Sequence, residues 1–275
     1  MSVPLSKFVE GWPRLHYLEW NPDGRETIVL LHGSTANAWW WKPLAGVLDV
    51  NQFRIIALDQ RGHGDSEWVH PPAYSPDDYA SDLERFIRDL GLARPIIAGH
   101  SMGGISVLSF AARFGDAARA VIAIDVAVTS SRQRDRFMIR LKSLPTVFYS
   151  DQATAIARFR LMPHEGVIAP EVIAEIAGHS LRRTIDGRYT FKFDRASFFG
   201  GDGLDVPAAV ARIRIPTLLI RAEMSRIMTA EASANAVASN RLVRMVEIPA
   251  AHHHVPLECP ELLAQAITEF VAGVP

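Results

Sequence analysis

Two kinds of hydrophobic pattern alternate along most of the chain. Apolar residues recur at helical spacing in residues 79–90, which present one apolar face before Gly91 ends the helix, and again in residues 261–271. Short, largely apolar runs bounded by turn residues predict buried strands. These runs lie at residues 15–20, 27–31, 53–58, 95–98, 121–124, 217–220 and 242–248. Strands that alternate with helices favour a mostly parallel sheet with helices on both faces, so the predicted fold class is α/β.

The alternation stops between residues 127 and 206. This stretch is rich in arginine, and nine of the 24 aromatic residues lie within its roughly 80 positions, more than an even spread would give. They are Phe137, Phe148, Tyr149, Phe159, Tyr189, Phe191, Phe193, Phe198 and Phe199. The pattern therefore separates this stretch from the strand–helix units on either side of it.

Residues 99–103, Gly-His-Ser-Met-Gly, form a G-x-S-x-G pattern between a predicted strand and a predicted helix. In that context a serine lies on a sharp strand-to-helix turn with its hydroxyl exposed above the sheet. The flanking glycines are needed because the turn forces unusual dihedrals and leaves no room for side chains. Ser101 is therefore the candidate nucleophile. Since a serine hydroxyl is a weak nucleophile, it needs an adjacent base and donors for the charge that it creates.

Two further motifs follow other predicted strands. His32-Gly33-Ser34 comes after one run, and residues 59–66, Asp-Gln-Arg-Gly-His-Gly-Asp-Ser, come after the next. Together with Gly-His-Ser-Met-Gly-Gly, in this order and spacing, they make the chain resemble the α/β-hydrolase superfamily over nearly its whole length. The likeness is greatest to the small, single-domain bacterial members. The resemblance implies a fold and a catalytic layout, but no particular substrate.

The resemblance also implies how the chain divides. Residues 1–126 and 207–275 would form the α/β-hydrolase core, and residues 127–206 would be inserted as a helical cap over the active site. Some aromatic residues are expected to line an apolar substrate pocket, while others hold the cap to the core. The candidate pocket residues are Trp39, Phe137, Phe159, Arg158 and Arg160, of which the two arginines could hold a carboxylate.

Two backbone N–H groups are expected to form the oxyanion hole. One belongs to Met102, the residue after the nucleophile, and the other to Ser34 in the loop after the first strand motif. Asp59, Arg61 and Asp65 of the second motif are expected to be structural ties beneath the site rather than catalytic groups.

The C-terminal residues 248–260 resemble the superfamily's catalytic histidine loop. Alignment through Val-Pro-Leu-Glu places the catalytic base at His253, with His252 at a position usually held by glycine and His254 at a variable one. Neighbouring histidines on a loop cannot easily face one ion, and no carboxylate or cysteine cluster accompanies them. We therefore expect no metal and no cofactor.

The catalytic acid departs from the superfamily pattern. After the strand at 217–220 the chain reads Arg-Ala-Glu-Met-Ser-Arg, with Arg226 where an aspartate is usual. A guanidinium has no acceptor and cannot orient an imidazole through its N–H. Two carboxylates keep the order serine, acid, histidine: Asp125 at the end of an earlier strand, which we favour, and Glu223. A dyad without an acid is the third alternative.

Composition narrows the function classes. The net charge of −1 gives no electrostatic case for nucleic acid or an anionic membrane, and one cysteine excludes an internal disulfide and suits the cytoplasm. The predicted function is a serine hydrolase that cleaves a carboxylic ester, lactone or thioester with an apolar part through an acyl-enzyme, acting on a small-molecule substrate. A carbon–carbon bond hydrolase of the meta-cleavage type is the alternative, followed by a cofactor-independent oxygenase or lyase and by a ligand receptor. The sequence leaves a homodimer open.

Overall fold

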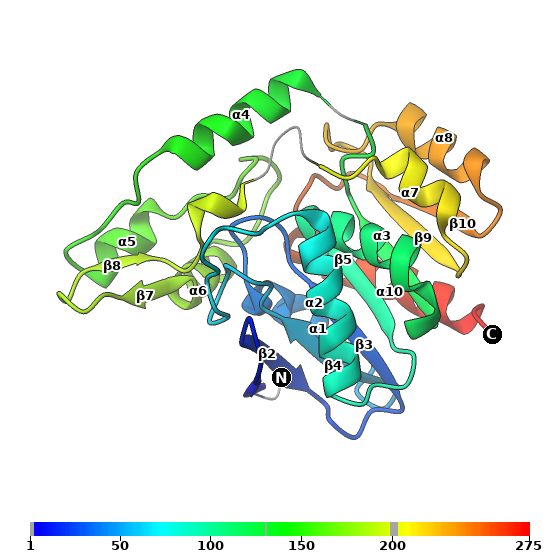
Figure 1. Cartoon of the computed structure of the whole chain (residues 1–275), viewed down its shortest axis with the longest axis horizontal. Coiled ribbons are helices and arrows are strands. Elements are labelled where there is room, and N and C mark those ends of the chain that lie inside the picture. The colour runs from blue at the N-terminus through cyan, green and yellow to red at the C-terminus, as the bar shows by residue number, and fades with distance from the viewer. Residues whose placement is uncertain (1–2, 130, 199–202) are drawn as a thin grey trace.

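The computed structural model describes residues 3–129, 131–198 and 203–275, and its centre is an eight-stranded sheet (Figure 1). The strand order is β1-β2-β4-β3-β5-β6-β9-β10. The strands are β1 Leu5–Val9, β2 Leu15–Trp20, β3 Glu26–Leu31, β4 Phe53–Leu58, β5 Ile96–His100, β6 Ala120–Ile124, β9 Thr217–Ala222 and β10 Val243–Ile248. The β1–β2 and β2–β4 pairs are antiparallel, whereas the pairs from β4 to β10 are parallel. The mostly parallel α/β sheet predicted from the sequence is confirmed, and β1 adds an edge strand before the first predicted one.

Helices cover both faces of the sheet. On one face lie α2 Pro76–Asp89, α3 Met102–Phe114, α7 Val206–Arg212 and α8 Ala230–Ser239, and on the other lie α1 Lys42–Ala45, α9 Val255–Glu258 and α10 Pro260–Ala272. The short 3₁₀ helices of the core are η1 Ala38–Trp41 and η2 Gly115–Ala117. In β3, Val29 and Leu31 pack with α2 and α3, whereas Ile28 and Leu30 pack with α1 and α10. Because successive strand side chains point to opposite faces, the apolar residues 28–31 of this strand require cover on both sides.

Local sequence determines where the helix α2 begins and which of its faces is buried. Ser75 caps it by accepting from the backbone N–H of Asp78, and the Asp78 carboxylate accepts in return from the backbone N–H of Ser75. Pro76 occupies the first turn, where its missing N–H costs nothing. Buried Leu83 and Phe86 then hold the apolar face of the helix against the sheet.

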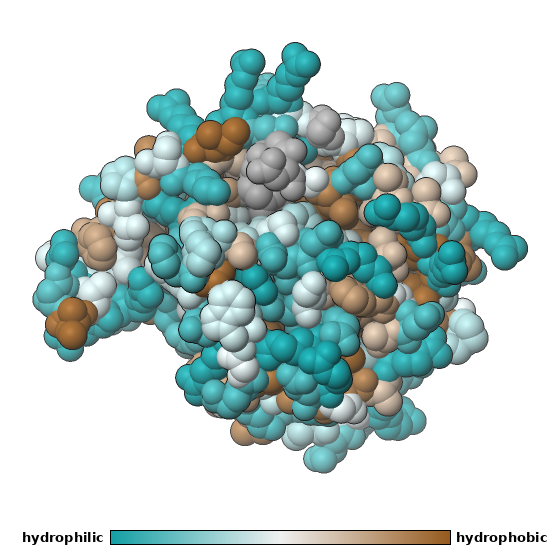
Figure 2. All heavy atoms as spheres, in the orientation of Figure 1, coloured by the Kyte–Doolittle hydropathy of each residue, from teal (hydrophilic) through white to brown (hydrophobic). Residues whose placement is uncertain are grey.

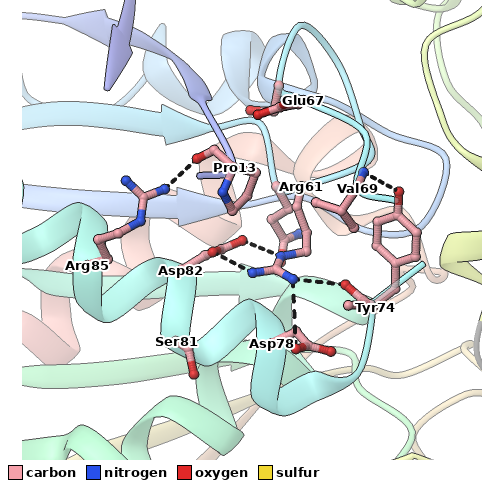
Figure 3. A network of polar contacts seen from close by, with 12 residues as sticks. Pro13, Arg61, Glu67, Val69, Tyr74, Asp78, Ser81, Asp82 and Arg85 are labelled. Atoms are coloured by element: carbon pink, nitrogen blue, oxygen red, sulfur yellow. Dashed lines mark hydrogen bonds and ion pairs between the residues drawn. The ribbon is translucent and has the colours of Figure 1, made fainter. Parts of the chain in front are cut away.

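A network of polar contacts joins α2 to the loop after β4 (Figure 3). The Arg61 guanidinium donates to both carboxylate oxygens of Asp82, at 2.5 and 2.7 Å, and to the carbonyl of Ala73. Asp59 accepts from the backbone N–H of Ala38 and contacts His16 Nδ1, both at 2.6 Å. These groups therefore tie strand ends and loops together with their own hydrogen bonds.

The segment between β6 and α7 lies outside the sheet (Figure 1). It contains α4 Arg132–Ser143, α5 Gln152–Arg158, α6 Pro170–His179, the antiparallel hairpin of β7 Leu181–Arg183 and β8 Tyr189–Phe191, and η3 Arg195–Ser197. The segment thus combines three helices with a two-stranded hairpin that follows α6, and its role as a cap stays a prediction. Phe199, one of the aromatic residues of this stretch, lies outside the described residues.

Hydrophilic side chains cover most of the face shown in Figure 2, with apolar residues scattered among them. Within the described ranges, no helix combines the length and hydropathy that crossing a bilayer requires.

Candidate active site

Ser101 lies on a strained turn between β5 and α3. Its backbone has φ 53° and ψ −117°, a combination that costs energy in a residue other than glycine. A Cβ on Gly99 would collide with the backbone of Gly103, and a Cβ on Gly103 would collide with the carbonyl oxygen of Leu31. The Ser101 backbone N–H donates to the Ile124 carbonyl at 2.9 Å, which anchors the turn to β6. The motif thus builds the sharp elbow that the sequence predicted.

Ser101, His253 and Asp125 form one chain of hydrogen-bonding contacts. The distance from Ser101 Oγ to His253 Nε2 is 3.1 Å, and the distance from His253 Nδ1 to Asp125 Oδ2 is 2.7 Å. Because an ionised carboxylate only accepts, Nδ1 carries the proton and Nε2 is left to accept from the serine hydroxyl. The imidazole is therefore held in the tautomer that a general base for Ser101 needs.

Strand order explains how Asp125 reaches this position. It follows β6, which lies between β5 and β9, and its backbone N–H donates to the Ile220 carbonyl of β9 at 2.7 Å. Its carboxylate is fully buried and accepts from the Ser225 hydroxyl and from the backbone N–H of Ala222. Burial raises the pKa of Asp125, and these donors oppose that rise by stabilising the ionised form.

Ser225 is a site residue that sequence reasoning missed. It lies immediately before Arg226, the residue that stands where the superfamily usually has the acid. This neighbouring hydroxyl is the feature of the sequence from which its role could have been inferred. Arg226 is exposed. Glu223 is also exposed, and its carboxylate accepts from the backbone N–H of Ala250 at 2.8 Å. Of the two candidate acids, Asp125 is thus the carboxylate that contacts His253.

The loop after β3 lies directly beside Ser101. A Cβ on Gly33 would stand 3.2 Å from the Cβ of Ser101. Buried His32 holds this loop: its Nδ1 contacts the Gly33 carbonyl at 2.8 Å, and its Nε2 accepts from the backbone N–H of Gln60 at 3.1 Å. Among the described residues, neither the Ser34 nor the Met102 backbone N–H has an acceptor. No described protein group therefore accepts from the two amides expected to form an oxyanion hole.

The three consecutive histidines face different partners. The His252 ring contacts Glu258 at 3.1 Å, the His253 ring contacts Asp125 and Ser101, and the His254 ring donates from Nε2 to the Pro163 carbonyl at 2.8 Å. The rings do not converge on one point, so the histidine run does not form a shared metal site.

Residues of the segment between β6 and α7 and of the elbow hold the histidine loop in place. The Glu165 carboxylate accepts from the backbone N–H of His253 at 3.1 Å, and His100 Nε2 donates to the His253 carbonyl at 2.7 Å. Glu258 accepts from the backbone N–H groups of His252 and Val167. The backbone of the histidine loop is thereby fixed from both sides.

Among the described residues, one group of side chains has the spacing of metal ligands. The ligand atoms of His16, Asp59 and Asp65 lie within 4.8 Å of one another. The Asp59 carboxylate, however, already accepts from the backbone N–H of Ala38 and contacts His16, and Asp65 pairs with Lys192. The cluster is therefore explained by contacts within the protein.

The five predicted pocket residues have different surroundings. Trp39 stacks on His179 with ring centroids 3.5 Å apart, and buried Phe159 packs with Trp40 and Leu257 in a cap–core cluster. Arg158 and Arg160 are exposed, and Arg160 donates to carbonyls of its own helix end. Phe137 is 52% exposed on α4. The five residues thus lie in different local environments, and their predicted role in a substrate pocket stays a prediction.

Burial of neutral histidines makes stability depend on pH. Burial lowers the pKa of His63 to about 3 and the pKa values of His253 and His254 to about 4, from an ordinary value of 6.5. Below pH 6.5 these histidines therefore become protonated in the unfolded chain but stay neutral in the native protein. We expect the free energy of unfolding to fall between pH 6.5 and pH 4, by about 1.4 kcal/mol per pH unit for each such histidine.

Urea denaturation at pH 7, 6 and 5 measures this loss. Replacing buried His63 by glutamine should reduce the slope of stability against pH, whereas the same change at exposed His70 should leave the slope as it is. Equal stability at pH 6.5 and pH 5 would contradict the expectation.

An elbow serine on a mostly parallel sheet, beside a histidine and a buried carboxylate, is the arrangement of the α/β-hydrolase class. The family model described as "Alpha/beta hydrolase family" matches residues 28–266. The chain belongs to this family.

Relatives and solved structures agree with this assignment. The 2-(acetamidomethylene)succinate hydrolase of Mesorhizobium japonicum is 28% identical over 248 residues, covering 89% of this chain and 87% of that protein. An esterase of Mycobacterium tuberculosis is 25% identical over 254 residues, covering 90% and 82%. The solved E-2-(acetamidomethylene)succinate hydrolase has a TM-score of 0.85 at 28% identity, covering 98% of this chain and 100% of that one. These relatives support a hydrolase of this family.

Proposed function

We propose that the protein is a serine hydrolase that cleaves a small carboxylic ester, lactone or thioester through an acyl-enzyme. The observation that carries the proposal is the continuous contact chain from Ser101 through His253 to Asp125. The esterase relative supports ester chemistry, because it shares most of its length with this chain.

In this mechanism His253 Nε2 takes the proton of Ser101 as Oγ attacks the substrate carbonyl. Burial lowers the pKa of His253 to about 4, so the base is neutral and ready at pH 7. Asp125 holds the Nδ1 proton and stabilises the imidazolium that forms. The N–H groups of Ser34 and Met102 receive the developing oxyanion, His253 returns the proton to the leaving group, and water then cleaves the acyl-enzyme.

Cleavage of a carbon–carbon bond is the alternative within the same layout. It requires cationic groups that hold the substrate's carboxylate, and the exposed Arg158 and Arg160 give it no support at the site. The relative from Mesorhizobium japonicum is named for a substituted succinate, which favours a small acyl substrate for this chain as well.

A fluorophosphonate probe and a substrate panel test the proposal together. We expect covalent labelling of Ser101 and hydrolysis of para-nitrophenyl butyrate, a lactone or a thioester. Labelling should disappear in His253→Ala and persist in His252→Ala, whose ring contacts Glu258 instead. Cleavage of a dienoate without cleavage of any ester, lactone or thioester would favour the carbon–carbon alternative. A protein that is neither labelled nor active would contradict the hydrolase proposal.

A further inference from the structure

A second contact chain of serine, histidine and aspartate lies at the edge of the sheet, outside the site described above. The distance from Ser6 Oγ to His16 Nε2 is 2.9 Å, and the distance from His16 Nδ1 to Asp59 Oδ2 is 2.6 Å. The corresponding distances at Ser101 are 3.1 and 2.7 Å. A hydroxyl within hydrogen-bond reach of a base that a third group orients is the arrangement that activates a serine.

The pairing of β1 with β2 brings these groups together. The two strands run antiparallel with Phe8 opposite His16, so Ser6, two residues before Phe8, lies on the face of β1 that meets the His16 ring. Lys7 points to the other face, where it pairs with Glu19. The strand period therefore makes the serine, rather than the neighbouring lysine, the partner of His16.

Buried contacts hold the imidazole and the carboxylate in place. His16 and Asp59 are each 2% exposed, and the ring centroids of His16 and Phe8 lie 4.9 Å apart. Burial opposes the ionised form of Asp59, but its contacts with His16 and with the backbone N–H of Asp65 outweigh burial and lower the pKa of the carboxyl. Because an ionised carboxylate only accepts, His16 Nδ1 carries the proton, and Nε2 of the neutral ring accepts from the Ser6 hydroxyl.

Ser6 is the accessible member of this chain, and it lies away from the candidate active site. Ser6 is exposed in β1, whereas its two partners are buried. In the sheet, β2, β4 and β3 lie between β1 and β5, the strand that ends directly before Ser101 (Figure 1). The two serines therefore belong to separate sites.

We propose that Ser6 is a second nucleophile of this chain, which takes the acyl or phosphonyl group of an activated donor. Ser6 Oγ forms a bond to the carbonyl carbon or the phosphorus of the donor, and the hydroxyl proton passes to His16 Nε2. The bond to the leaving group breaks, the leaving group departs with the electron pair, and the imidazolium releases the proton to it or to water. Asp59 accepts from Nδ1 throughout and stabilises the imidazolium. The inference goes beyond the hydrolase function proposed above and does not depend on it.

The surroundings of Ser6 favour a single modification over turnover. Ser6 lies within a strand, whereas Ser101 stands at the N-terminus of α3, where two backbone N–H groups are proposed to receive the oxyanion. Each such donor contributes about 100- to 1,000-fold to the rate. We therefore expect Ser6 to react only with donors that carry a good leaving group, and to keep the group that it has taken.

A fluorophosphonate probe applied to the Ser101→Ala variant tests this inference. We expect Ser6 to be phosphonylated at least about a hundredfold faster than Ser81, because a positioned general base contributes about 100- to 10,000-fold. Ser81 is the internal control: it is also exposed, but its hydroxyl donates to the Asp77 carbonyl instead of a histidine. Tandem mass spectrometry of tryptic peptides assigns each modification and separates Ser6 from Ser2 of the same peptide.

Two variants connect the reaction to the contact chain. Ser101→Ala/Ser6→Ala should lose the label on the N-terminal peptide. His16→Gln in the Ser101→Ala background should label Ser6 no faster than Ser81, since an amide does not take up the hydroxyl proton, and circular dichroism shows whether this variant is folded. The comparison of Ser6 with Ser81 leaves His16 intact, so it decides the inference even where His16→Gln does not fold.

Either of two results would overturn the inference. One is labelling of Ser6 no faster than that of Ser81, and the other is unchanged labelling of Ser6 in a folded His16→Gln variant. Labelling of Ser101 in the wild type is measured separately, so its absence would contradict the hydrolase function and leave the result at Ser6 as it stands.

Discussion

Replacing Ser101 by alanine should abolish ester hydrolysis and leave the fold intact. The Oγ atom forms the bond to the substrate, and removal of such a nucleophile lowers kcat by about a millionfold. Alanine has the same backbone preferences as serine at φ 53°, and the close glycine contacts that shape the elbow remain. We therefore expect the melting temperature to stay near that of the wild type while kcat falls below detection.

The comparison requires a serine that lies away from the site. Ser81 on α2 is exposed and donates to the Asp77 carbonyl within its own helix, so Ser81→Ala is a matched control with unchanged kcat. A rate above about a hundredth of wild type in Ser101→Ala would show that hydrolysis does not need this nucleophile.

Asp125→Asn should lower kcat by about a thousandfold or more. The asparagine amide donates where the carboxylate accepted, so His253 loses the partner that keeps its proton on Nδ1 and its lone pair toward Ser101. The Ser225 hydroxyl and the Ala222 N–H would still require an acceptor at the same side chain. The substitution therefore changes the tautomer of the imidazole rather than the space that the side chain fills.

Two further variants distinguish this acid from its neighbours. Glu223→Gln should leave kcat close to wild type, because the amide oxygen can still accept from Ala250. Ser225→Ala should have an intermediate effect, since it removes one donor from the Asp125 carboxylate and leaves the carboxylate itself. A near-normal rate in Asp125→Asn would contradict its role and would leave a histidine–serine dyad as the better explanation.

The aromatic and basic residues predicted to line the pocket show where local sequence patterns were insufficient. Trp39 and Phe159 differ little from Phe137 as apolar aromatic candidates, yet the first stacks on His179, the second packs into the cap–core cluster and the third is exposed on α4. Arg158 and Arg136 are likewise both cap arginines. Their surroundings depend on how the helices fold over the core, and local residue patterns do not contain that information.

The sheet, the elbow and the order of the catalytic candidates could be predicted from local residue patterns, because strand runs, glycine-flanked turns and loop motifs are set by local sterics and hydrophobic periodicity. The choice between Asp125 and Glu223 depended on how the strands are arranged in space. Asp125 and His253 are 128 positions apart, and they meet because parallel strands place their carboxyl ends at one edge of the sheet. The role of Ser225 was decided in the same way, since a hydroxyl becomes a partner of the acid only when β6 and β9 lie side by side.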